Sequence, residues 1–340
     1  MKIAIDLGTT YSVVYVVGRG VVLREPSAVA IHKETGDVIA YGDKARGMLG
    51  RVPATIEVIR PLRDGVIAHF EAAREILRHF IEVATQRRWI KRSHIVICVP
   101  HGATPVEMDS LKRESLAAGA HGVDLVKEPF AAALGAGLPI GEPKGSLIVD
   151  IGGGTTEATA ISLSSIVHCE SLRMAGNAMD QAIEEHFRTH HLFAIGETTA
   201  ERLKIDHGSV MPPADGTQKV ALKGLNVRTG CPGVLRVPVA EIYEALEPTF
   251  SQIIEAIRRT IEYLPPELAG DILTEGGSMV GGGALLRGWR GRLQDALGLP
   301  IRIDEDPLMA VTRGLIKILE DRSRFSDLIL NSEYQPALGV

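Results

Sequence analysis

The stretch Asp150-Ile151-Gly152-Gly153-Gly154-Thr155-Thr156 decides the fold of this chain. It follows the largely apolar run 146–149, which predicts a buried strand with the Asp150 carboxylate at its end. Glycine has no Cβ, so three in succession let the backbone turn sharply and approach a ligand closely. Consecutive amide N–H groups in such a turn suit an anion, and the two threonines add hydroxyl donors. Since a carboxylate holds Mg²⁺ through oxygen or water ligands, the stretch predicts a metal–phosphate loop.

The same pattern occurs near the start of the chain. Residues 3–10 are again an apolar strand followed by Asp6, a glycine and the pair Thr9-Thr10. After each loop the chain continues as a strand, over 11–17 and 157–163. Two copies in one register predict a duplicated α/β unit that clamps one nucleotide phosphate from both sides. The alternative is a pair of ordinary hairpin turns, which require neither the aspartate nor the threonines.

Length and composition limit the possible classes of protein. A chain of 340 residues exceeds one core of ordinary size and predicts two domains. A formal net charge of −5 argues against general nucleic-acid binding, and we expect no nucleic-acid partner. The three cysteines show no metal-binding spacing, and Cys98 in its apolar strand reads as a small apolar residue. Neither a signal peptide nor a run of eighteen apolar residues is found, so we expect a cytoplasmic protein.

Two further positions suggest a ligand site. Glu128 follows the short strand 124–126 and precedes Pro129 at the start of a helix, where α/β ligand sites gather. Beside two phosphate loops a catalytic role is favoured over a simple helix N-terminal charge. The stretch 281–283 is a third strand-to-glycine switch, without charge, which suits a base and ribose. Its alternative is a close packing turn between helix and sheet. Asn177 is expected to cap a helix.

Together these motifs carry a resemblance. The segments 6–10, 128–129, 150–156 and 281–283 resemble the superfamily of actin, DnaK-type chaperones and sugar kinases. Within it the chain is similar to the MreB family of bacterial actins, through the segments 20–27, 59–68, 265–268 and 281–287. The resemblance covers roughly residues 3 to 319.

The resemblance implies a fold and its boundaries. The fold is α/β and actin-like: two duplicated α/β domains around a nucleotide cleft, each with a small subdomain insertion. The first domain is expected over 1–140, with its insertion at about 24–70, and the second over 141–310, with its insertion at about 178–240. A C-terminal helix packing back on the first domain, and a tail, are expected over 311–340.

It also implies a site for ATP and Mg²⁺, since phosphoryl transfer needs mainly positioning and charge neutralisation. Asp6 and Asp150 would hold the metal through water, and Glu128 would orient or deprotonate the attacking water with help from Thr155. The other expected contacts are, for the phosphates, Gly8, Thr9, Thr10, Tyr11, Gly152, Gly153, Gly154 and Thr155, and, for the nucleoside, Gly176, Glu201, Arg202, Lys204, Gly281, Gly282, Gly283 and Ala284.

The chain departs from the family pattern at several positions. Tyr11 stands where an asparagine is usual and cannot copy its amide donor. Lys127 stands where an acidic residue is usual, and the amphipathic N-terminal helix of many family members is missing. The remaining membrane candidate is Trp89 and Ile90, flanked by cations at 87–88 and 91–92, a pattern that suits an anionic bilayer surface. The alternative is that Trp89 packs against its own domain.

The implied function is a slow, polymerisation-coupled ATPase whose homopolymer filaments lie on the inner membrane and organise cell shape and wall synthesis. Adaptor or wall-synthesis proteins are the further partners implied. A second hypothesis is a filament for plasmid or organelle positioning, similar to the magnetosome actin. A monomeric chaperone or sugar kinase is disfavoured, because no substrate-binding domain follows residue 340 and no sugar-binding acid is evident.

Overall fold

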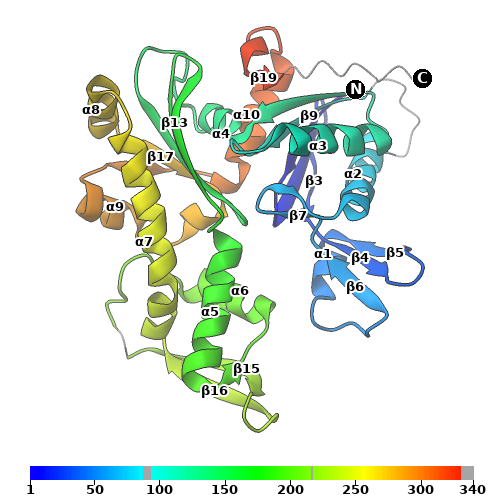
Figure 1. Cartoon of the computed structure of the whole chain (residues 1–340), viewed down its shortest axis with the longest axis vertical. Coiled ribbons are helices and arrows are strands. Elements are labelled where there is room, and N and C mark those ends of the chain that lie inside the picture. Colours follow the sequence, from blue (N-terminus) through cyan, green and yellow to red (C-terminus); the bar gives the residue numbers. More distant parts are fainter. Residues whose placement is uncertain (87–92, 216, 331–340) are drawn as a thin grey trace.

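A computed structural model describes residues 1–86, 93–215 and 217–330. Trp89 and Ile90, the residues expected at a membrane, lie outside the described residues. The described chain forms two halves that lie side by side, each built on one large sheet (Figure 1). The small sheets with β4–β6 (residues 29–59) and with β15–β16 (residues 219–238) lie below the large ones in this view, apart from each other. Among the described residues no helix is both long enough and apolar enough to span a bilayer.

The first half is organised by a sheet in the strand order β19-β10-β9-β1-β2-β3. β1 pairs antiparallel with β2 and parallel with β9. Alternate residues of β1 face opposite sides. Ile3 and Ile5 pack toward α2 and α3, whereas Ala4 packs toward α4 and α10. The elements are β1 (Lys2–Leu7), β2 (Tyr11–Val16), β3 (Gly20–Pro26), β9 (His94–Val99), β10 (Gly122–Lys127), β19 (Ile329–Leu330), α2 (Phe70–Thr85), α3 (Pro105–Ala117), α4 (Glu128–Gly135) and α10 (Ala310–Glu320).

The second half repeats this arrangement in the order β13-β12-β11-β17-β18. β11 pairs antiparallel with β12 and parallel with β17, as β1 does with β2 and β9. The matching topology supports the predicted duplication. The elements are β11 (Ser146–Ile151), β12 (Thr156–Ser162), β13 (Ser165–Leu172), β17 (Gly277–Val280), β18 (Ile301–Ile303), α5 (Gly176–His191), α7 (Ala240–Glu262), α8 (Pro266–Glu275) and α9 (Trp289–Leu297).

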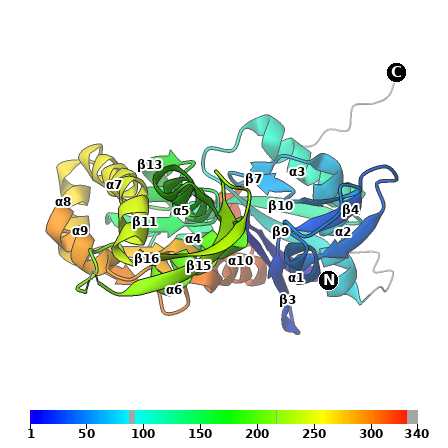
Figure 2. The same ribbon diagram turned by 90° about the horizontal axis from the view of Figure 1, so that it is seen from below.

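Each half carries an additional small sheet, and Figure 2 shows them from below on either side of the molecule. In the first half the sheet order is β5-β4-β6, with a separate hairpin β7–β8, and in the second half it is β14-β15-β16. The elements are β4 (Val29–His32), β5 (Val38–Tyr41), α1 (Gly42–Gly47), β6 (Ile56–Ile59), β7 (Leu62–Arg63), β8 (Val66–Ile67), β14 (Phe193–Ala194), α6 (Glu197–His207), β15 (Lys219–Asn226) and β16 (Pro232–Pro238).

The two halves share one apolar core around α4 and α10. Ala4 of β1 and Ile148 of β11 both contribute to it. The helices approach closely, because a Cβ on Gly135 would lie 1.7 Å from the Ala310 carbonyl oxygen and one on Gly314 would lie 1.8 Å from that of Ala131. This packing fixes the relative position of the two sheets, and with it the positions of the loops at their strand ends.

The expected cap at Asn177 is wrong. α5 begins at Gly176, with Ala175 in the N-cap position, so Asn177 lies inside the first turn. Its side-chain oxygen accepts a hydrogen bond from the Thr10 hydroxyl at 3.1 Å. Asparagine, which often caps a helix N-terminus, is therefore used here to join the two halves through its side chain.

Candidate functional site

Two carboxylates from the repeated loops lie at the junction of the halves. Asp6 and Asp150 follow Ala4 and Ile148 by two residues, so the strand alternation directs them toward the same inner side as the shared core. Burial raises the pKa of Asp6 to about 6. Burial and, next, the Asp6 charge raise the pKa of Asp150 to about 7. A divalent cation there would offset both effects, so the donor set fits a metal held in part through water.

No direct metal cluster accompanies these acids. Within 1–86, 93–215 and 217–330, no three His, Cys, Asp or Glu side chains are placed to hold a metal ion together. Asp6 accepts hydrogen bonds from the Cys98 thiol at 3.6 Å and from the Thr312 hydroxyl at 3.3 Å. Cys98 is buried as expected, but its thiol also contacts a site carboxylate, which the apolar reading did not include.

The first loop uses its side chains to contact other segments. The Thr9 hydroxyl oxygen accepts a hydrogen bond from the Gly65 amide at 3.0 Å. The Thr10 hydroxyl reaches Asn177 in the other half. The Tyr11 hydroxyl accepts from Arg46, whose guanidinium also lies 5.3 Å from the Tyr11 ring centre. Position 11 therefore carries a cation contact in place of the amide donor that the resemblance implies.

The second loop brings bare backbone against the first. A Cβ on Gly153 would lie 1.9 Å from the Thr10 hydroxyl oxygen, and one on Gly154 would lie 2.8 Å from that of Thr9. The Gly152 amide donates to the Thr155 carbonyl at 2.9 Å, which closes the turn. The glycines are thus required where the two loops touch.

The two threonines of the second loop differ in their surroundings. The Thr156 hydroxyl donates to the Met174 carbonyl oxygen at 2.6 Å, and the residue is fully buried. The expectation that both threonines offer donors to a ligand is therefore wrong for Thr156. Thr155 is partly exposed and lies beside the glycine turn.

Glu128 is the first residue of α4, directly after β10. Burial raises its pKa well above the ordinary value, and the charges of Asp150, Glu157 and Asp6 add to the effect. These causes place Glu128 in the same acidic site as both loop carboxylates.

The residues expected around a nucleoside lie at the start of α5, on α6 and in the third glycine stretch. Lys204 donates to the Gly176 carbonyl and to Asp180, both at 2.9 Å, which ties α6 to α5. Glu201 pairs with Arg46 of α1. Arg202 is exposed on α6.

The third glycine stretch packs against β11. A Cβ on Gly281, whose φ is +80°, would lie 2.4 Å from an Asp150 carboxylate oxygen. A Cβ on Gly283 would lie 2.2 Å from the Ile151 side chain, and Ala284 is 2% exposed. Close packing is sufficient to explain Gly281 and Gly283, as the alternative reading expected. Gly282 has more space, with Leu308 at 3.4 Å.

Sequence reasoning did not identify Glu157. This carboxylate is 3% exposed and accepts from the His101 amide at 2.9 Å and from the Ser171 hydroxyl at 3.2 Å. Burial is the first cause that raises its pKa, to about 7. Glu157 lies directly opposite Asp150 in the β11–β12 pair, and opposed residues share one face of a sheet. The pairing of Glu157 with Asp150 across the β11–β12 hairpin is the feature from which this residue could have been predicted.

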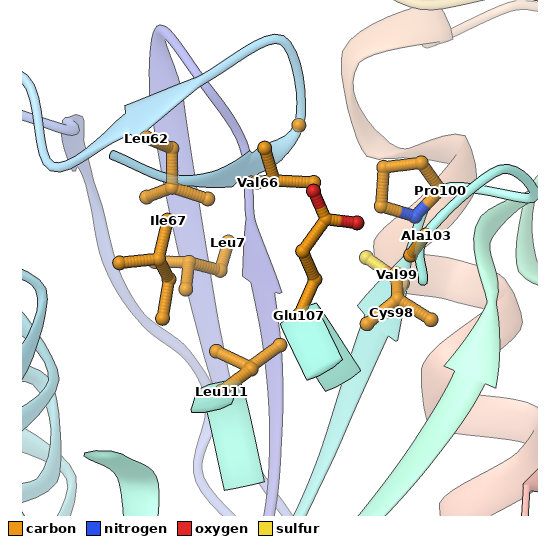
Figure 3. A pocket seen from close by; sticks show the side chains of 11 residues that line it. Leu7, Leu62, Val66, Ile67, Cys98, Val99, Pro100, Ala103, Glu107 and Leu111 are labelled. Atoms are coloured by element: carbon orange, nitrogen blue, oxygen red, sulfur yellow. The ribbon is translucent and has the colours of Figure 1, made fainter. Parts of the chain in front are cut away.

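A small pocket lies behind the first loop, between the β7–β8 hairpin, β9 and α3 (Figure 3). Leu7 and Pro100 are among its apolar lining residues, and Glu107 supplies a carboxylate. Gly65 at the hairpin tip adopts φ +78°, and a Cβ there would lie 2.4 Å from the Pro100 ring. The close contact of Gly65 with Pro100 holds the β7–β8 hairpin in place beside Thr9.

Two duplicated α/β halves, joined at a shared core with matching acidic loops, define the actin-like class of proteins. The MreB/Mbl protein family model matches residues 1–327, and the chain belongs to that family. It is 43% identical over 323 residues to cell shape-determining protein MreB of Escherichia coli (strain K12), covering 94% of this chain and 93% of the relative.

Solved structures agree with the expected fold. MreB5 of Spiroplasma citri bound to ADP has a TM-score of 0.90 at 36% identity, covering 96% of this chain and 98% of the other. The MamK double helical filament has a TM-score of 0.79 at 24% identity, covering 94% of this chain and 99% of the other. The predicted actin-like fold and MreB-family resemblance are both confirmed.

Proposed function

We propose that this chain binds ATP with Mg²⁺ between its halves, hydrolyses it slowly and polymerises into filaments that determine cell shape. The observation that carries the proposal is the contact of the two loops through Thr10 and Gly153, with Asp6 and Asp150 near the ends of the strands that lead into them. It is supported by the solved structures of MreB5 of Spiroplasma citri bound to ADP and to AMPPNP. The domain boundaries that we propose are 1–140 for the first domain, 141–310 for the second, and 311–340 for the C-terminal helix and tail.

Bound Mg²⁺ would neutralise charge on the phosphates. Asp6 and Asp150 would hold it, through water, at the base of the site. The loop amides of 152–154 and the hydroxyl groups of Thr9, Thr10 and Thr155 would orient the phosphate chain. Glu128 would accept a proton from the attacking water, because a cation beside Asp150 lowers the cost of a charged Glu128. Tyr11 would act through Arg46 rather than by an amide donor.

The first experiment tests the chemistry. Glu128→Ala should slow ATP hydrolysis by on the order of a hundredfold or more while nucleotide still binds, because a positioned general base is lost. Glu142→Ala, which removes an exposed carboxylate beside Lys144, is the control and should leave turnover unchanged. Normal hydrolysis by Glu128→Ala would remove Glu128 from the mechanism.

The second experiment tests assembly. Ultracentrifugation with and without ATP should sediment the wild-type chain only with ATP, as a polymer. A chain that binds ATP but stays in the supernatant would favour the monomeric chaperone or sugar-kinase reading. The filament for plasmid or organelle positioning remains the second candidate, because the MamK likeness supports the same fold. The 43% identity to the cell-shape relative favours the first.

We extend the proposal to a cytoplasmic location at the inner membrane surface, with wall-synthesis or adaptor proteins as partners. Burying the apolar groups of Trp89 and Ile90 at a bilayer would contribute about 1.5–3 kcal/mol each. Each nearby cation would add about 1 kcal/mol on an anionic leaflet. Because ordering and desolvation offset much of this for one copy, a filament would bind through many copies.

The membrane proposal is tested by co-sedimentation with anionic liposomes. A Trp89→Ala, Ile90→Ser double variant should polymerise with ATP but lose lipid binding. Neutral liposomes control for the contribution of the cations. Equal lipid binding by variant and wild-type filaments would exclude this segment as the anchor.

A further inference from the structure

Two arginines of the first half contact one helix of the second. Arg46 of α1 pairs with Glu201 of α6. Arg60, in the connection between β6 and β7, pairs with Glu197 at the first position of the same helix. Glu197 and Glu201 are four residues apart, so they lie on one side of α6. In Figure 1, α1 belongs to the blue first half and α6 to the green second half.

Both ion pairs are partly shielded from water. The side chains of Arg46 and Glu201 are 23% and 15% exposed, and those of Arg60 and Glu197 are 26% and 38% exposed. Arg46 also donates to the Tyr11 hydroxyl, so one guanidinium connects α1, the first loop and α6. Attraction between such pairs is weakened less by salt than that of fully exposed charges, but it is still weakened.

α6 is also tied to its own half, by Lys204 on the same face of the helix. Lys204 contacts the Gly176 carbonyl and forms an ion pair with Asp180, 4% exposed, on α5. The second half therefore holds α6 through Lys204, while Arg46 and Arg60 hold it from the first half. Any movement that separates α6 from the first half must break both arginine contacts.

We propose that Arg46 and Arg60 are positioning residues that hold α6 across the nucleotide site, and that their ion pairs set the rate at which nucleotide leaves. This inference rests on the proposed function, because it assumes that nucleotide lies beside α6. Release requires α6 to separate from the first half, so it is slowed by the two pairs together. Since both pairs are electrostatic, added salt should accelerate release.

Arg60 and Glu197 give the cleaner test, because neither is among the residues proposed to touch nucleotide. Arg60→Glu and Glu197→Arg each place like charges together, and each should accelerate release of a fluorescent ATP analogue by about three- to tenfold, since loss of a partly exposed pair and new repulsion both favour opening. The double variant restores an opposite-charge pair and should return release to within about twofold of wild type.

Matched controls separate the pair from general charge effects. Arg188→Glu and Glu185→Arg reverse an exposed pair within α5, one that does not cross between the halves, and should leave release unchanged. Melting temperatures of all variants report any effect on folding. If a charge reversal prevents folding, the neutral variants Arg60→Gln and Glu197→Gln replace it, with about two- to fivefold faster release expected.

The outcomes are distinct. Faster release in both single variants with recovery in the double variant supports the inference. Unchanged release in the single variants, or fast release retained in the double variant, overturns it while leaving nucleotide binding established. Failure of the wild-type chain to bind the analogue with Mg²⁺ would instead contradict the proposed function, and the inference with it.

Discussion

The two phosphate loops share a pattern but contribute different groups to the site. In the first loop, Thr9 and Thr10 extend side chains that bond Gly65 and Asn177. In the second, Gly153 and Gly154 present backbone with no room for a Cβ. Thr156, the second threonine of that loop's pair, donates its hydroxyl to the Met174 carbonyl inside its own half.

The difference shows how a duplicated unit can form one site. Each copy keeps the strand and its carboxylate, because strand alternation directs both aspartates inward. At the contact between the loops only one partner can carry side chains, since interiors leave no space for two. The first loop therefore supplies hydroxyl groups, and the second supplies amides and space.

Breaking the contact should have the largest effect. Gly153→Ala should weaken ATP binding by about tenfold to a hundredfold, because its Cβ would collide with Thr10 and overpacking of this kind costs about 1–3 kcal/mol. The matched variant Gly152→Ala, whose Cβ would lie 3.3 Å from the Thr155 carbonyl oxygen, should have a much smaller effect. Titration calorimetry measures both, and equal affinities would show that the loops do not depend on this contact.

Substituting the two aspartates tests the property that the loops share, a carboxylate that holds the metal. Asp6→Asn and Asp150→Asn should each weaken Mg²⁺-dependent ATP binding by about tenfold or more, as loss of a group that orients a bound metal typically does. Circular dichroism should show both variants folded. If only one substitution matters, the two loops do not contribute equivalent metal-holding groups.

Matched hydroxyl deletions test how the copies differ. Thr156→Val should reduce the free energy of unfolding by about 1–3 kcal/mol, because the buried Met174 carbonyl loses its donor. Thr10→Val should change stability less and mainly weaken nucleotide binding, because its bond to Asn177 is only partly buried. Thermal melts and ATP titrations separate the effects. The opposite pattern would reverse the roles assigned to the loops.

The smallest effect expected is a pH dependence. The folded-state pKa values, about 6 for Asp6 and about 7 for Asp150, exceed the ordinary value of 3.8, so the folded state binds protons more tightly than the unfolded state. Stability of the metal-free protein should therefore fall as pH rises from about 4 to about 7, by about 1 kcal/mol or more. Melting curves at several pH values should show this slope. Asp150→Asn should flatten this slope more than Asp6→Asn. Stability that increases with pH over this range would contradict the raised pKa values of the two aspartates.

Much of the site could be predicted from local sequence. The strand–Asp–Gly–Thr pattern at 3–10 and 146–156 determined the duplicated loops, and the strand-to-helix switch identified Glu128. These features are local, because strand period and glycine geometry depend on neighbouring residues. The family motifs added the actin-like architecture, which the structural comparison confirms.

Only the tertiary structure determined which groups meet. Arg46 and Glu201 are separated by 155 positions, as Asp6 and Thr312 are by 306, and no local pattern links such pairs. The same reason explains the wrong expectations for Asn177 and Thr156, whose partners come from other segments of the chain. Sequence determined the two loops, whereas packing of α4 against α10 decided how they face each other, because side-chain contacts across a shared core depend on positions in space.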